Sequence, residues 1–154
     1  MATAKQTRKA AKRVTTRRAK TTGAHSGGCL CGAIRFTARG KPNHIGNCHC
    51  TQCRKSSGAP FLTFAGFASK AVTFAKGKPK YFRSSKWAAR GFCPQCGTSL
   101  VYKLTKDASK IWLAVGAMDR PERLAPRSHI FTTTMVKWLK FRDGLPRYKA
   151  FSPS

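Results

Sequence analysis

CHCTQCRKSSGAPF, the stretch from Cys48 to Phe61, places three cysteines within six residues and follows them directly with Arg54 and Lys55. Three thiols so close together in the chain cannot all bridge one another. Three is also one fewer than the four ligands of a closed tetrahedral zinc site. The stretch therefore predicts either a metal site left open or part of a larger site, and the remaining cysteines have to decide between the two.

The other four of the seven cysteines lie in two short motifs, CLCG at 29–32 and FCPQCG at 92–97. The second motif has the spacing of a zinc knuckle, and in the first the side chains two positions apart share one face of an extended segment. Closed four-thiolate tetrahedra are the usual structural solution for zinc, so we predict one such site, which joins an early strand to a late one. Its ligands are Cys29, Cys31, Cys93 and Cys96.

With those four thiols used, no other cysteine remains to complete the set of Cys48, Cys50 and Cys53. Three protein ligands and an open position are the arrangement of a catalytic zinc, so we predict a second zinc there and two zinc ions in all. Two alternatives stay open. They are a second structural zinc closed by a distant His or Asp, and a reduced triad without metal.

His49 and Arg54 lie next to these cysteines in the chain. His49 alternates away from its neighbours, so we expect a surface or hydrogen-bonding histidine rather than a fourth ligand. Arg54 is expected either to stabilise the thiolates and attract an anionic thiol to the open position, or to belong to a generally basic surface.

The use of cysteine also bears on the cellular compartment. Three disulfides with one cysteine left over would suit a secreted protein, but the tight spacings and the lack of a visible secretory signal favour metal in a reducing compartment. We therefore expect an intracellular location, in the cytoplasm, the nucleus or the mitochondrial matrix. No apolar run approaches the roughly 18 to 20 residues of a membrane span.

From Gly27 onward the sequence has the features of an all-β domain. Short runs of β-branched and aromatic residues are separated by Gly, Pro, Asn or Ser, and in AIRFTA the residues Ile34, Phe36 and Ala38 alternate inward. Only one helical turn is expected, near residues 54–57. The predicted strands lie in AIRFTA (33–38), FLTFAGF (61–67), AVTF (71–74), SLVYKL (99–104), IWLAVGA (111–117), HIFTTT (129–134) and VKWLKF (136–141).

Charge sets this chain apart from most soluble domains. Thirty-one Lys and Arg face four acids, for a net charge of +27 over 154 residues. Such an excess favours an anionic macromolecular partner, such as RNA, DNA or an acidic protein surface. Eight basic residues lie in residues 1–25, which leaves 23 basic and four acidic residues, or +19, on residues 26–154.

Residues 1–25 form a low-complexity segment of Ala, Thr, Lys and Arg, which we predict to be a basic arm preceding the domain at 26–154. Three interpretations stay open for the arm: a mitochondrial transit peptide, a nuclear or nucleic-acid-binding arm, and a solubilising tail. The residues expected to contact a polyanion are Lys5, Arg8, Lys9, Lys12, Arg13, Arg17, Arg18 and Lys20.

Six motifs together resemble the glutathione-dependent formaldehyde-activating enzyme and centromere protein V family, over about residues 26–150. They are GGCLCG (27–32), CHCTQCRKSSGAPF (48–61), FCPQCGTSL (92–100), GAMDRP (116–121), PRSHI (126–130), and Trp138 with DGLPRY (143–148). The resemblance implies the β-tent fold, a structural zinc on the four-cysteine set and a second zinc on the three-cysteine set. It also implies carbon–sulfur lyase chemistry, in which a thiol such as glutathione adds to formaldehyde or a related carbonyl, or the adduct comes apart.

Two functions follow from these observations. The first is a zinc-dependent carbon–sulfur lyase that acts on thiol adducts of a carbonyl, with Cys48, Cys50 and Cys53 as its open zinc site. The second is a non-enzymatic, strongly basic protein of ribonucleoprotein, chromatin or microtubule assemblies that uses the same zinc fold. The family pattern favours the first, and the net charge of +27 favours the second.

Overall fold

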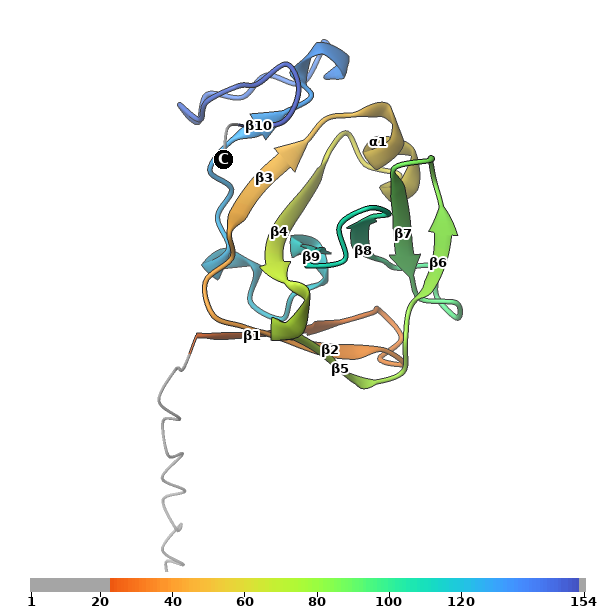
Figure 1. Ribbon diagram of the computed structural model, residues 1–154. Coiled ribbons are helices and arrows are strands. Elements are labelled where there is room, and N and C mark those ends of the chain that lie inside the picture. The colour runs from red at the N-terminus through yellow and green to blue at the C-terminus, as the bar shows by residue number, and fades with distance from the viewer. Residues whose placement is uncertain (1–22, 153–154) are drawn as a thin grey trace, which may run out of the picture.

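The computed structural model describes residues 23–152, which form two β-sheets and one short α-helix (Figure 1). The smaller sheet is antiparallel, with the strand order β1-β2-β5. Its strands are β1 (Ala24–Gly28), β2 (Arg35–Arg39) and β5 (Val72–Lys76). The inward alternation predicted for AIRFTA is confirmed, because Ile34, Phe36 and Ala38 are all buried in the main hydrophobic core.

The larger sheet has seven strands in the order β10-β3-β4-β9-β8-β7-β6. All of its neighbours are antiparallel except β10 and β3, which run parallel. Its strands are β3 (His44–Cys48), β4 (Leu62–Ala68), β6 (Lys80–Arg83), β7 (Ala88–Phe92), β8 (Ser99–Leu104), β9 (Lys110–Ala114) and β10 (His129–Ile130). The all-β fold class is therefore confirmed.

The helix α1 (Thr51–Ser57) follows β3 directly. Cys50 caps its N-terminus, where its sulfur accepts a hydrogen bond from the Cys53 amide at 3.3 Å. Gly58 ends it in the left-handed conformation, at φ 67°, which a glycine adopts without steric cost. Short 3₁₀ turns complete the regular structure at Ser69–Ala71, Val115–Ala117, Pro121–Arg123 and Thr132–Thr134.

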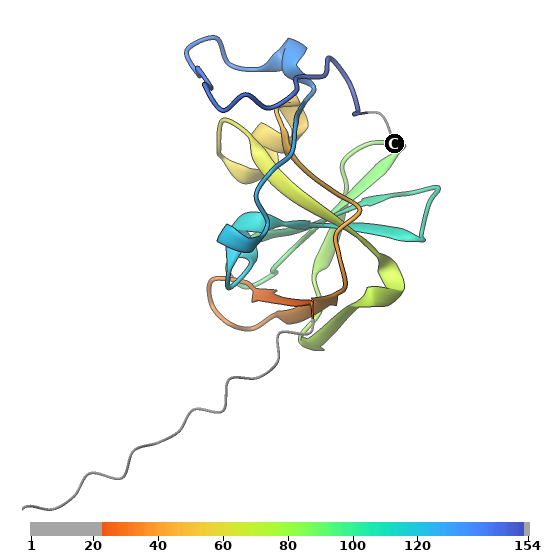
Figure 2. The same ribbon diagram turned by 90° about the vertical axis from the view of Figure 1, so that its left-hand side faces the viewer.

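The three-stranded sheet lies at one end of the molecule, and the segment after β10 lies at the other end (Figures 1 and 2). Between them lies the larger sheet, with β3 and β4 on one side, β7 and β6 on the other, β9 and β8 in between and α1 above (Figure 1). Strand β1 makes backbone contact with the segment that follows β9, at the bridge between Gly27 and Met118 and where the Asp119 amide donates to the Ser26 carbonyl at 2.9 Å.

Several predicted elements differ in the structure. VKWLKF (136–141) is not a strand but turn and irregular backbone, and in HIFTTT only His129–Ile130 pairs before a 3₁₀ turn begins. The helix is longer than the expected turn because Cys50 supplies an N-cap. Strand β1 begins at Ala24, two residues before the boundary predicted at residue 26.

The eight basic residues of the predicted arm lie outside the described residues, so its role stays a prediction. Within residues 23–152, no helix is both long and apolar enough to cross a membrane.

The contact between β1 and the segment after β9 gives the first testable prediction. A Cβ added at Gly27 would lie 2.5 Å from the Ala117 carbonyl oxygen and 2.5 Å from Cζ of Phe36. We expect Gly27→Ala to lower the free energy of unfolding by about 1–3 kcal/mol, the usual cost of overpacking. Denaturant unfolding at a fixed free zinc concentration measures it.

Gly116 provides the matched control, because an added Cβ there meets nothing within 4 Å. Gly116→Ala is expected to change the free energy of unfolding by no more than about 0.5 kcal/mol. Equal effects of the two substitutions would contradict the close packing inferred at Gly27.

Candidate active site

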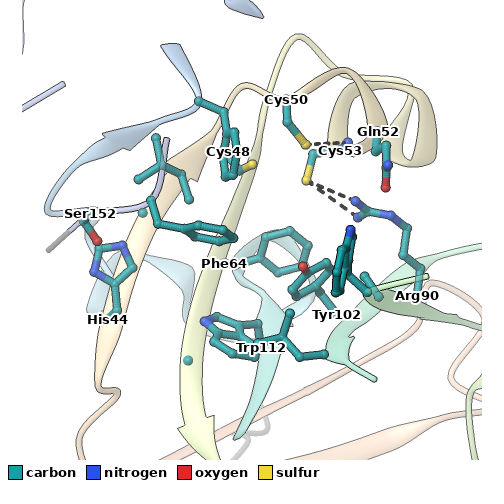
Figure 3. A pocket seen from close by; sticks show the side chains of 18 of the residues that line it. His44, Cys48, Cys50, Gln52, Cys53, Phe64, Arg90, Tyr102, Trp112 and Ser152 are labelled. Carbon is teal, nitrogen blue, oxygen red and sulfur yellow. Dashed lines mark hydrogen bonds between the residues drawn. The ribbon is translucent and has the colours of Figure 1, made fainter. Parts of the chain in front are cut away.

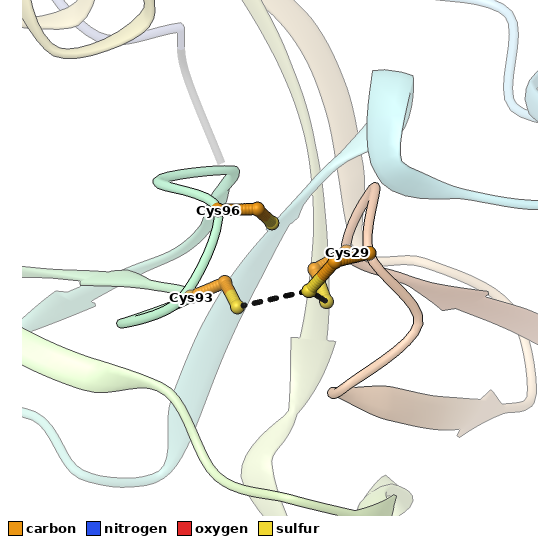
Figure 4. Close-up of side chains that lie close together, drawn as sticks. Cys29, Cys93 and Cys96 are labelled. Carbon is orange, nitrogen blue, oxygen red and sulfur yellow. Dashed lines mark hydrogen bonds between the residues drawn. The ribbon is translucent and has the colours of Figure 1, made fainter.

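Two hairpin turns bring together the four cysteines predicted for the structural metal. Cys29 and Cys31 lie in the turn between β1 and β2, and Cys93 and Cys96 lie in the turn between β7 and β8. In each turn a glycine has a positive φ, 71° at Gly32 and 74° at Gly97, which lets the backbone curl around the sulfurs. Figure 4 shows Cys93 and Cys96 facing Cys29 from the opposite turn.

The geometry of this set fits a metal ion. The four sulfurs all lie within 4.8 Å of one another, with 3.5 Å between Cys29 and Cys31 and 3.8 Å between Cys31 and Cys93. Tetrahedral zinc with Zn–S bonds of about 2.3 Å requires sulfurs about 3.8 Å apart. The Ile34 amide donates to the Cys29 sulfur at 3.2 Å, and hydrogen bonds from the Thr98 hydroxyl and amide lower the pKa of Cys96 to about 5. These contacts favour thiolates, the form that binds metal.

The second set assembles where β3 meets α1. Cys48 ends the strand, Cys50 caps the helix and Cys53 lies in its first turn, and their sulfurs all lie within 4.8 Å of one another. Among residues 23–152 no fourth His, Cys, Asp or Glu joins this set. None of the seven cysteines forms a disulfide.

The three thiols differ in their electrostatics. Hydrogen bonds from Cys48 and Cys53 lower the pKa of Cys50 to about 2, and the bond to Cys50 raises the pKa of Cys48. At least one thiolate is therefore favoured in the set even before a metal is considered.

Arg90 of β7 is the charged residue that contacts the three-cysteine set. Its Nη1 and Nη2 lie 3.6 Å and 3.5 Å from the Cys53 sulfur, and its guanidinium lies 5.3 Å from the ring centre of Tyr102 (Figure 3). Arg90 is buried, and no carboxylate of the described chain pairs with it. A buried guanidinium needs an anionic partner, so Arg90 indicates a net negative charge on the sulfurs. Three thiolates and one Zn²⁺ would carry a charge of −1 and fit that requirement.

A cavity of about 1150 Å³ opens in front of these sulfurs. Aromatic side chains from three strands, Phe64 of β4, Tyr102 of β8 and Trp112 of β9, lie below the sulfurs in Figure 3 and line the cavity with Arg90. No carboxylate lines it, since all four acids of the chain lie elsewhere among the described residues. Burial raises the pKa of Tyr102, so its phenol stays protonated at neutral pH.

The segment after β10 contributes the outer wall. Phe131 and Phe151 both line the cavity and pack against each other, with ring centres 4.8 Å apart. Phe131 is the one non-glycine residue of the described chain with a positive φ, 55°. A strained backbone of this kind persists only where the surroundings hold it, and here the Phe131 amide donates to the Ala150 carbonyl at 3.1 Å.

His49 does not line the cavity but belongs to a buried chain of hydrogen bonds. Of the two roles expected from the sequence, a surface histidine or a hydrogen-bonding one, the structure has the second. Its Nε2 lies 2.8 Å from Nδ1 of His129, whose Nε2 lies 2.8 Å from the Asp143 carboxylate. Burial, followed by the charges of His129, Arg147 and Arg54, lowers the pKa of His49 to about 4. This chain ties the cysteine segment to the C-terminal segment.

From the sequence, Arg54 rather than Arg90 was expected to be the positive charge that stabilises the thiolates of the three-cysteine set. In the structure Arg54 lies in α1, and its Nε is buried without a hydrogen-bond partner, while Arg90 donates to Cys53. The role of Arg54 stays a prediction. Arg90 lies 37 residues from Cys53, and no local motif marks it.

The sequence profile of the family described as "Glutathione-dependent formaldehyde-activating enzyme" matches residues 24–134. The chain belongs to this family. The match covers both hairpin turns with their cysteines, the helix α1 and the strands that line the cavity. The family resemblance predicted from the sequence motifs is therefore confirmed.

Two further proteins are similar to parts of the chain. A protein of Schizosaccharomyces pombe named as an uncharacterized lyase is 36% identical over 81 residues, which span 53% of this chain and 58% of that protein. A crystal structure of a Rhodobacter sphaeroides protein is 16% identical, with a TM-score of 0.48, over 79% of this chain and 98% of that one. The chain thus matches little more than half the length of the curated relative.

The buried histidine chain gives the second prediction. In His129→Ala, His49 and Asp143 lose their shared partner and a cavity opens where the ring was. We expect the free energy of unfolding to fall by about 2–4 kcal/mol, from the lost hydrogen bonds and the cavity together. Denaturant unfolding with zinc held constant measures it.

Trp138→Ala is the control, because Trp138 is 69% exposed and belongs to the same C-terminal segment. It is expected to cost about 0.5 kcal/mol or less. A His129→Ala protein as stable as the Trp138→Ala protein would rule out a structural role for the chain.

Proposed function

We propose that this protein is a zinc-dependent carbon–sulfur lyase that joins a glutathione-type thiol to formaldehyde or a related carbonyl, or separates the two. The observation that carries the proposal is the three-cysteine set, which lacks a fourth protein ligand and opens on a large cavity. A metal held by three protein ligands keeps one position for substrate. Membership of the formaldehyde-activating family and the lyase name of the yeast relative support the reaction class.

Zinc bound to Cys48, Cys50 and Cys53 would supply a Lewis acid that lowers the pKa of a thiol substrate. The chain's own residues have separate tasks. Arg90 offsets the negative charge of the sulfurs and fixes Cys53 through its two contacts. The Tyr102 hydroxyl can donate a hydrogen bond to the oxygen of the carbonyl as negative charge develops there. The aromatic walls exclude water, which strengthens both interactions.

In the same proposal, Cys29, Cys31, Cys93 and Cys96 hold a second zinc that has a structural role. A set closed by four thiolates leaves no position for a substrate. Thiols that must stay reduced to bind metal suit a reducing compartment, and the intracellular location remains part of the proposal.

The third prediction separates the two metal sites. In Cys50→Ser, we expect the zinc content to fall from two ions per chain to one, with turnover of the glutathione–formaldehyde adduct reduced to background and the folded structure retained, at a smaller loss of stability than at the four-cysteine set. Elemental analysis gives the metal content, and NMR exchange between the adduct and free formaldehyde gives the turnover.

Cys96→Ser is the matched variant in the closed set. It should also lose one zinc, but with a large loss of stability, because that metal joins the two sheets. An unsubstituted protein that holds two zincs and turns over no thiol–carbonyl adduct would refute the lyase proposal.

A second candidate function is the binding of single-stranded nucleic acid, and the distribution of charge supports it. Of the 23 Lys and Arg residues in the described chain, only Arg35 is paired with a carboxylate, that of Asp119. On the hairpin of β6 and β7, Trp87 is 53% exposed, with the ammonium groups of Lys86 and Lys106 at 4.7 and 5.7 Å from its ring centre. Cations beside an exposed aromatic ring suit phosphates and a stacked base.

The fourth prediction tests this candidate on the full chain with a fluorescent single-stranded RNA. If six or more phosphates are contacted, affinity should fall by about 10³ or more between 50 and 200 mM salt. Trp87→Ala should weaken binding about tenfold by removing one stacking platform, while Trp138→Ala should not. An RNA affinity that does not change with ionic strength would exclude nucleic-acid binding. If an acidic polypeptide binds as tightly as the RNA, the partner is a protein instead.

A further inference from the structure

The cavity in front of Cys48, Cys50 and Cys53 is larger than a one-carbon carbonyl requires. Its volume is about 1150 Å³, whereas pockets for drug-sized ligands measure about 300–1000 Å³. Formaldehyde adds only one carbon and one oxygen to the sulfur of its thiol partner. On the basis of the thiol–carbonyl chemistry proposed above, we propose that the carbonyl part of the substrate carries an apolar substituent of about the size of an aromatic ring, which binds against the cavity wall.

The wall next to the sulfurs has the chemistry for such a group. Phe64 packs in one apolar cluster with Cys48 and Cys53, and the rings of Tyr102 and Trp112 adjoin that cluster. The ring centres are 5.9 Å apart between Phe64 and Tyr102 and 5.7 Å apart between Tyr102 and Trp112. These spacings are typical of edge and tilted aromatic packing, so a further ring can join the row.

The position of the wall decides which part of the substrate it meets. The reacting carbon is bonded to the thiol sulfur, so its substituent starts beside Cys48, Cys50 and Cys53, where Phe64 lies (Figure 3). The charged groups of a peptide thiol would find their partners elsewhere, for instance at Lys110, which lines the cavity among residues that include no carboxylate. Polar groups placed against the aromatic row would lose hydration without compensation.

The reaction itself is unchanged and balances without an oxidant or a reductant. The thiolate sulfur forms a bond to the carbonyl carbon, the π electrons of the C=O bond move to oxygen, and that oxygen takes up the proton that the thiol lost. The reverse direction breaks the same sulfur–carbon bond and releases the thiol and the carbonyl compound.

The test compares two unreactive probes that differ only in the group on sulfur, S-methylglutathione and S-benzylglutathione. Calorimetric titration of the full, zinc-loaded chain measures their affinities. We expect the benzyl probe to bind at least about tenfold more tightly, because its ring leaves water for the aromatic wall. Equal affinities, or no measurable binding of either probe, would overturn the inference.

Two variants and a control locate the effect. Trp112→Ala should reduce the preference for the benzyl probe to about threefold or less while the affinity for the methyl probe changes little. Trp138→Ala, at an exposed position outside the cavity, should leave both affinities unchanged. If Trp112→Ala weakens both probes equally, the ring does not bind at this wall.

Thr133→Trp covers the case in which Trp112→Ala does not fold. Thr133 is exposed and lines the cavity, so added bulk there should fill space without disturbing the core. We expect the benzyl probe to lose more affinity than the methyl probe, and an equal loss would contradict the proposal.

Binding and turnover can fail independently. A preference for the benzyl probe without turnover of any adduct would refute the lyase proposal, and with it a carbonyl substrate, and would leave only an aromatic binding wall beside the sulfurs. Turnover of the formaldehyde adduct by a protein that binds both probes alike would refute only the aromatic substituent.

Discussion

The junction of four thiols between two hairpin turns is the constraint on which the rest of this structure depends. One turn belongs to the three-stranded sheet and the other to the seven-stranded sheet, and the cysteines that meet are more than 60 residues apart in the chain. At this junction the Leu30 amide also donates to the Thr98 hydroxyl at 3.1 Å, and the Gly27–Met118 bridge and the Arg35–Asp119 ion pair join the smaller sheet to the segment after β9. The metal proposed at this junction would be a cross-link between the sheets, and a small domain gains most from a cross-link that closes so long a loop.

The same junction bears on the candidate active site through β7. This strand ends directly before Cys93, and two residues before its end it carries Arg90, whose guanidinium reaches Cys53. A register shift lies between Gly91 and Phe92, and before it Arg90 pairs with Tyr102 of β8. This pairing decides whether position 90 faces the cavity, because side chains alternate along a strand. A one-residue slip would remove the buried cation from the three sulfurs. Strand β7 thus carries a cation of one cysteine set and leads directly into the turn of the other.

Local spacing explains what the sequence predicted well. The motifs CLCG and FCPQCG each encode a turn with its own glycine, and CHCTQC encodes the end of a strand and the cap of a helix. The strand at 99–104 was predicted with its correct bounds because SLVYKL is rich in apolar and aromatic residues. Strands β1, β3, β6 and β7 were missed. AHSGG, HIGNC and AARGF contain glycine and few β-branched residues, and KYFR is only four residues long and half basic, so their strand structure comes from pairing with neighbouring strands. VKWLKF has the composition of a strand but no partner in the fold.

The residues that sequence reasoning missed share one property, which is that their partners are distant in the chain. Arg90 meets Cys53 across 37 positions, and His129 meets His49 across 80. The aromatic row also comes from three separate strands, so no motif contains it. Both cysteine sets offer thiol ligands to a metal, and what distinguishes them in the structure is these distant neighbours. Two turns enclose one set, whereas a buried guanidinium and an open aromatic cavity face the other. The number of cysteines that each set offers can therefore be read from the sequence, whereas the side chains that would surround a bound substrate come together only in the fold.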